Sequence, residues 1–92
     1  MHVDSLRVRL LVRESRSLKD KRQVVRSILD RLRNGFNVAA AEVEALEHRQ
    51  LAVLGFAMVG NEAFHVRTTL EQIVAALRGH PVAELVDHQM EL

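Results

Sequence analysis

The chain contains 92 residues, of which 48% are hydrophobic and 27% are charged. This length and composition predict one folded domain over residues 1–92 and exclude a disordered chain. The chain contains no cysteine, which excludes disulfide bridges and thiolate metal sites. No apolar run approaches the roughly 18 residues that span a bilayer, and no leader-like segment precedes the first strand, so we expect a cytoplasmic protein without membrane contact.

The net charge of +1 conceals an uneven distribution of charge along the chain. Residues 1–33 contain ten Lys and Arg against four Asp and Glu, a net charge of +6. Residues 34–92 contain three against eight, a net charge of −5. This division predicts one basic and one acidic surface, which is compatible with a polyanionic partner or with head-to-tail association.

Residues 3–13 alternate between two kinds of side chain from Leu6 onward, which predicts a β-strand. One face carries Leu6, Val8, Leu10 and Val12. The opposite face carries Arg7, Arg9, Leu11 and Arg13. The apolar face should enter the core, and the arginine face should point away from it.

Residues 18–34 have the apolar spacing of an amphipathic helix, with Leu18, Val25, Leu29 and Leu32 on one stripe. Ser17 is the predicted N-cap, and Asp20 lies three residues later in a capping-box position. Asn34-Gly35 should end the helix, with the glycine in the left-handed conformation.

Residues 37–50 give conflicting signals. Their alanines and glutamates favour a helix by intrinsic propensity, whereas Val38, Ala40 and Val43 fit a strand that contains a bulge. Residues 51–59 form a continuous apolar run of strand length that needs a neighbouring strand. We therefore predict a hairpin from Asn37 to Val59 that turns within residues 46–50.

Residues 61–79 predict a second amphipathic helix, with Asn61 as N-cap and an apolar stripe of Val66, Leu70, Ile73, Val74 and Leu77. Gly79 should close this helix, and Pro81 prevents its continuation. From Val82 onward, Val86, His88, Met90 and Leu92 alternate with polar residues, which predicts a last strand.

The predicted order is β-α-β-β-α-β, which favours an α+β, ferredoxin-like fold: a four-stranded antiparallel sheet with both helices on one face and the first and third strands in the centre. The third strand, residues 51–59, is apolar on both sides, and only one side can lie under the helices. The other must be exposed or covered by a partner. We therefore expect a homodimer through the sheet face or an edge strand, with Leu54, Phe56 and Met58 as candidate contacts.

Short stretches along nearly the whole chain form a recognisable set: Glu14-Ser15, Ser17-Leu18-Lys19, Lys21-Arg22, Leu32-Arg33-Asn34, Phe36-Asn37-Val38, Ala41-Glu42-Val43, and Leu54-Gly55 with Ala57 and Val59. Together they resemble the YlxP-like family of small bacterial proteins of unknown function. The resemblance implies a ferredoxin-like fold and no assigned catalytic activity. Such proteins are often encoded beside genes for translation initiation and ribosome maturation, which implies a connection with RNA or the ribosome.

The basic side chains of residues 7–33 form the candidate site, which would bind RNA phosphates without reading bases. Its predicted members are Ser17, Lys19, Lys21, Arg22, Arg26 and Arg33 on the helix, with Arg7 and Arg9 on the first strand. Lys21 lies near the apolar edge, where its stem can pack on the core while its charge stays in water. The simpler interpretation is a solvated helix face with local pairs such as Arg26–Asp30.

No residue pattern predicts a catalytic site, a metal site or a cofactor. The five histidines have no metal-ligand spacing, and the glycines are dispersed. Glu42 and Glu44 have the two-residue spacing of the solvent side of a strand. Phe56 is better explained by packing than by base stacking, because only three aromatic residues are present.

We therefore predict a non-enzymatic module that binds RNA or a ribonucleoprotein through basic side chains of the first strand and first helix. The alternative is a dimeric protein-interaction module that docks on another protein of the translation machinery. The two hypotheses differ in salt dependence, because phosphate binding weakens steeply with added salt.

Overall fold

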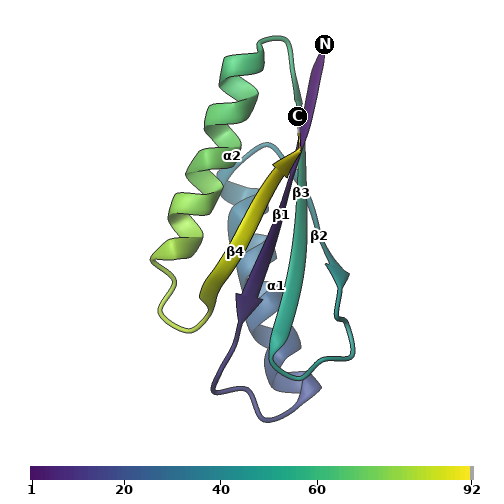
Figure 1. Ribbon diagram of the computed structural model, residues 1–92, viewed down its shortest axis with the longest axis vertical. Helices are drawn as coiled ribbons and strands as arrows, with labels where there is room; N and C mark the ends of the chain where they lie inside the picture. The colour runs from purple at the N-terminus through teal and green to yellow at the C-terminus, as the bar shows by residue number, and fades with distance from the viewer. Residues whose placement is uncertain (92) are drawn as a thin grey trace.

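The computed structural model describes residues 1–91 and contains six elements in the predicted order (Figure 1). They are β1 (His2–Leu11), α1 (Leu18–Gly35), β2 (Ala39–Glu44), β3 (Leu51–Gly60), α2 (Ala63–Arg78) and β4 (Glu84–Glu91). Leu92, which the sequence placed in the last strand, lies outside the described residues.

The four strands form one antiparallel sheet in the order β2-β3-β1-β4, so β1 and β3 occupy its centre. Both helices cover the same face of the sheet, and the other face carries no helix (Figure 1). The predicted ferredoxin-like α+β fold is confirmed.

The core lies between the helices and the covered face of the sheet. In the register of β1 and β3, Leu6 is opposite Phe56 and Val8 is opposite Leu54, so the apolar sides of the two central strands coincide. The buried stripes of α1 and α2 pack on them and include Val25, Ile28, Leu32, Leu70 and Ile73. One contiguous core therefore supports the domain.

This register corrects the assignment of Leu54, Phe56 and Met58 to a dimer or partner face. Their exposed fractions are 0%, 1% and 6%, because they lie beside the apolar residues of β1 under the helices. The alternate residues of β3, such as Val53 and Val59, face away from the helices on the open face of the sheet.

The centre of the open face is covered by side chains of the same chain. Arg7 and Glu44 come from the two strands that flank β3, and Arg7 Nη1 lies 3.4 Å from Glu44 Oε1. This pair spans β3 beside Val53, which is only 3% exposed although no helix covers it. The long stem of an arginine can cover apolar surface while its charge remains in water. A second subunit is therefore not needed to bury the middle of β3.

The beginning of α1 follows its sequence signature. Ser17 has extended backbone angles, and its Oγ accepts a hydrogen bond of 3.1 Å from the Asp20 N–H. The Asp20 carboxylate accepts one of 3.1 Å from the Arg16 N–H. These two bonds satisfy backbone donors near the helix N-terminus, as the capping-box pattern predicts.

Two other helix ends differ from the prediction. Gly35 is not left-handed, because no glycine of residues 1–91 has a positive φ. Phe36 instead adopts an extended conformation, and its N–H donates to the Leu32 carbonyl. Helix α2 begins one residue later than predicted, with Glu62 rather than Asn61 as N-cap and without a side-chain capping bond.

The predicted bulge in β2 is confirmed at Val43, between the paired residues Glu42 and Glu44. The inserted residue reverses the alternation of faces: Glu42 lies opposite Leu54 on the helix side, and Glu44 lies opposite Val53 on the open side. The prediction that both carboxylates share the solvent side is therefore wrong. The hairpin then turns at Ala45, which has a left-handed φ of 59°.

Candidate functional site

The first turn of α1 lies over the hairpin between β2 and β3, and Lys21 joins the two. Its side chain is fully buried, with an exposed fraction of 0%. Its Nζ donates to the carbonyl oxygens of Ala45 at 2.8 Å and Leu51 at 3.1 Å, and lies 3.4 Å from that of Leu46. An ammonium group has three protons to donate, which these three carbonyl oxygens can accept, and its charge is paired with a carboxylate.

The carboxylate is that of Glu42, whose Oε2 lies 2.9 Å from Lys21 Nζ. Glu42 lies on the same side of β2 as Ala40, under α1, where its side chain is 14% exposed. The ion pair compensates two charges that would be costly to bury alone. The structure thus withdraws Lys21 from solvent, which corrects its assignment to a phosphate-binding surface.

Hydrogen bonds hold the neighbouring loops at the same end of the molecule. Gln50 Nε2 donates to the Arg13 carbonyl at 2.9 Å, and the Val12 N–H donates to the Gln50 carbonyl at 2.8 Å. His48 Nδ1 accepts from the Gln50 and Leu51 N–H groups at 3.0 and 2.8 Å. The β1–α1 and β2–β3 loops are therefore fixed against each other and form a rigid support for surface residues.

The arginines of β1 and of the loop after it lie on the open face, away from the helices, as predicted, and each has a carboxylate partner. Arg7 pairs with Glu44 at 3.4 Å, Arg9 with Asp87 at 3.0 Å and Arg13 with Glu84 at 2.7 Å. The side chains of these pairs are about half exposed or more, so each pair contributes little to the stability of the fold. The pairs nevertheless neutralise the charge of the three arginines. Arg7 and Arg9 are thus poorly placed to attract a polyanion.

The cations of α1 differ in how they are paired. Arg33 contacts Asp30 at 3.4 Å and donates to the Ala40 carbonyl, so the predicted Arg26–Asp30 pair is replaced by an Arg33–Asp30 pair. Arg22 lies 3.9 Å from Glu47, a loose contact because Glu47 is 85% exposed. Within residues 1–91, Lys19 and Arg26 have no carboxylate within 4.0 Å.

Two further arginines, which the sequence analysis did not name as members of the site, lie in the two loops beside the start of α1. Arg16 and Arg49 line a shallow depression of about 490 Å³ between the β1–α1 and β2–β3 loops. The clustering of Arg49 with Arg16 could not be read from the sequence, because their loops meet only in the fold. We define the basic end by these residues: Arg16, Lys19, Arg22, Arg26 and Arg49.

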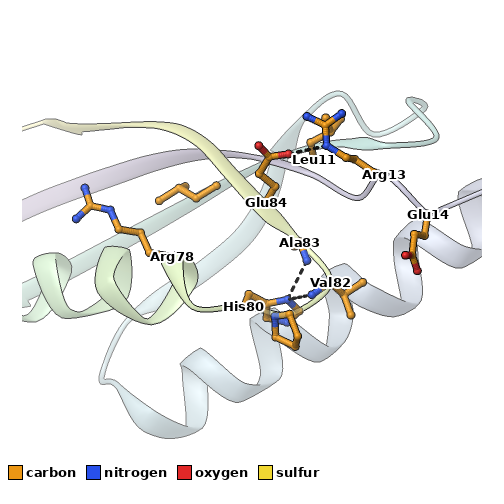
Figure 2. A pocket seen from close by; sticks show the side chains of 10 residues that line it. Leu11, Arg13, Glu14, Arg78, His80, Val82, Ala83 and Glu84 are labelled. Carbon is orange, nitrogen blue, oxygen red and sulfur yellow. Dashed lines mark hydrogen bonds and ion pairs between the residues drawn. The ribbon is translucent and has the colours of Figure 1, made fainter.

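A second polar region surrounds the α2–β4 loop. Figure 2 shows the ring of His80 in this loop and the Arg13–Glu84 pair across the same hollow of about 410 Å³. His80 Nδ1 accepts hydrogen bonds from the Val82 and Ala83 N–H groups at 3.1 and 3.0 Å. Burial, and to a lesser degree the charge of Arg31, lower the pKa of His80 below its ordinary value of 6.5.

Among residues 1–91 no group of three or more His, Asp or Glu side chains is placed to hold a metal ion. No helix in the same range has the length and hydrophobicity needed to cross a lipid bilayer.

The architecture defines a small ferredoxin-like α+β protein whose prominent surface feature is a basic end. Residues 3–90 match the family described as "Protein of unknown function (DUF503)", and the chain belongs to this family. It is 30% identical over 74 residues to the uncharacterised protein YlxP of Bacillus subtilis (strain 168), which covers 80% of each chain. The predicted YlxP-like family is confirmed.

Replacing Lys21 with Met should leave the Glu42 carboxylate buried without its cation. We expect the free energy of unfolding, measured by urea denaturation, to fall by about 3–5 kcal/mol. The double variant Lys21→Met, Glu42→Leu should recover most of this loss, because neither charge then needs to be desolvated. As a control, Arg9→Met breaks an exposed pair and should cost about 0–1 kcal/mol. Equal losses for Lys21→Met and Arg9→Met would contradict a structural role for the buried pair.

The lowered pKa of His80 predicts a pH dependence of stability. The folded state resists protonation of this ring, so stability is complete above about pH 6.5 and is lost as the pH falls toward the lowered folded pKa. His80→Asn retains a side-chain acceptor but does not titrate there. Urea denaturation between about pH 7.5 and about pH 5 should give a smaller loss of stability for this variant. Parallel profiles for the two proteins would exclude the effect.

Proposed function

We propose that this protein is a non-catalytic, cytoplasmic module that holds RNA through its phosphates at the basic end. The observation that carries the proposal is the gathering of five cations around the start of α1 and the two adjacent loops. Their one ion pair within residues 1–91 is the loose contact between Arg22 and Glu47. Elsewhere, the arginines of the open face are neutralised by carboxylates and Lys21 is buried.

Helix geometry supports several simultaneous contacts with a phosphate chain. Lys19, Arg22 and Arg26 follow i, i+3, i+7 spacing, which places them on one flank of α1 over about 10 Å. Arg22 approaches Glu47 of the hairpin tip, so Arg49 in the same tip extends the flank toward Arg16. Cations arranged in this way favour salt-sensitive binding of a polyanion.

The aromatic residues favour binding without base recognition. Phe56 is buried in the core, and Phe36 packs against it at the end of α1. Phe64 is 74% exposed but belongs to α2, away from both the open sheet face and the basic end. A sheet that presents no aromatic side chains lacks the stacking surface used by many RNA-binding domains.

The test compares charge reversal at the basic end with charge reversal elsewhere. Binding to a fluorescein-labelled oligouridine of about 20 nucleotides, measured by anisotropy, should weaken with salt by about 0.7 log units per log unit of salt for each phosphate contacted. Lys19→Glu, Arg26→Glu should lower affinity at least about tenfold, because two phosphate contacts become repulsive.

The matched control is Arg67→Glu, Arg78→Glu on α2, which changes the net charge by the same amount. It should retain most of the affinity, and circular dichroism should find both double variants folded. Equal loss in the two variants, or no binding by the wild-type protein at low salt, would refute the proposal.

Self-association is a second candidate function, favoured by one specific observation. Val3 and Val59 are cross-strand neighbours on the open face, and they are 57% and 53% exposed. They lie beyond the Arg7–Glu44 pair on the open face, where the nearest charged residue in the ladder is Glu91, opposite Ser5. A second copy of the chain that packed on this face would shield both valines from water.

The homodimer predicts a doubled molar mass in light scattering coupled to size-exclusion chromatography. Val59→Lys should restore the monomer, because it places a charge in the apolar contact. Phe64→Lys, a similar change on the helix side, should leave the dimer intact. A monomeric wild-type protein at all accessible concentrations would rule out this second function.

A further inference from the structure

A groove lies between the second half of α1 and the end of α2. Its volume is about 520 Å³, within the roughly 300–1,000 Å³ common for small-molecule sites. Its apolar lining includes Ile28, Leu32, Phe36 and Leu77. The groove exists because both helices pack on the sheet more closely than on each other.

Two polar side chains interrupt this apolar lining. Arg31 extends from α1, is exposed, and has no carboxylate within 4.0 Å in residues 1–91. His80 lines the groove from the α2–β4 loop, and its Nδ1 is occupied by two backbone N–H donors. A neutral ring that accepts at Nδ1 carries its proton at Nε2, where it is a donor. The described chain provides no acceptor for that proton.

The other hollows described above contain carboxylates, which would repel an anion. The hollow around Arg13 and Glu84 is charged, and those two residues neutralise each other at 2.7 Å. The hollow around Arg9 and Asp87 is likewise closed by an ion pair of 3.0 Å. Among the hollows of residues 1–91 described above, only the groove between the helices has an unpaired cation and no carboxylate in its lining.

We infer that this groove binds a small amphipathic monocarboxylate, with its carboxylate at Arg31 and His80 and its apolar tail along Ile28, Leu32 and Leu77. A guanidinium and a ring N–H supply donors to a carboxylate, and hydrogen bonds between charged groups are stronger than neutral ones. Burial of the tail supplies the rest of the affinity. This inference is independent of RNA binding, because the basic end and the groove share no residue.

The test uses octanoate as the probe, titrated into the isotope-labelled protein and followed by amide chemical shifts. Saturable shifts confined to the groove, with a Kd of about 1 mM or tighter, are expected. Octanol, which has the tail but no charge, and acetate, which has the charge but no tail, should each bind at least about tenfold more weakly.

Variants separate recognition from folding. Arg31→Gln should weaken octanoate binding about tenfold and leave octanol unaffected, whereas Arg67→Gln on the outer side of α2 should change neither. Ala76→Trp, an exposed position that lines the groove, should obstruct it, and the neighbouring exposed Ala75→Trp should not. Dispersed spectra establish that each variant is folded.

Three results would overturn the inference: no saturable shift at about 10 mM octanoate, equal affinity for octanol, or an unchanged affinity in Arg31→Gln. The last result would mean that Arg31 takes no part in holding the carboxylate.

Discussion

The buried ammonium of Lys21 is the interaction on which the basic end depends. It binds carbonyls of the β2–β3 loop and of the first residue of β3, and it pairs with Glu42 of β2. One side chain of α1 thereby fixes the position of a loop that has a left-handed residue, Ala45, and few buried apolar contacts of its own. Because Glu42 and the carbonyl oxygens compensate the charge of Lys21, this charge stabilises the contact between α1 and the β2–β3 loop and is not available to a ligand. The exposed cations beside it are available to a ligand, and the loops that carry them are fixed by hydrogen bonds.

On the open face of the sheet, exposed ion pairs between arginines and carboxylates cover the apolar side of β3. A ferredoxin-like sheet with both helices on one side leaves its second face to water, and β3 is apolar on both sides. The arginines of β1 lie over this surface and reach carboxylates on both flanking strands, as Arg7 does to Glu44 and Arg9 to Asp87. Individually these exposed pairs contribute little. Collectively they cover the middle of β3 and leave Val59 exposed near its end.

The two proposed binding regions lie on the helix side of the molecule and differ in chemistry. The basic end presents several cations along α1 and the two adjacent loops, an arrangement suited to an extended polyanion. The groove between the helices presents one cation and one ring donor above an apolar wall, a combination suited to a small molecule with a single charge. The conformation of the α2–β4 loop determines where the ring donor of the groove lies, because two backbone N–H groups of this loop donate to His80 Nδ1 and fix the ring.

The elements, their order and the fold could be predicted from the sequence, because periods of two and of 3.6 residues record which side of each element meets the core. The alternation predicted the strand β1, and the Ser17 cap predicted the start of α1. For residues 37–50, the need of residues 51–59 for a partner strand outweighed the intrinsic helix propensity. The candidate site could be predicted only in part, since Lys19, Arg22 and Arg26 share a flank by helical spacing alone.

Other features were decided by the tertiary structure. The register of β2 on β3 placed Glu42 beneath α1, where it pairs with the buried Lys21, although each looked like a surface residue by its own pattern. The inserted residue Val43 then turned Glu44 to the open face. The meeting of Arg16 with Arg49, and of Arg31 with His80, joins segments far apart in the chain. Local periodicity carries information about one element at a time, whereas charge pairing depends on distances between elements. Those distances exist only once the strands have taken their register.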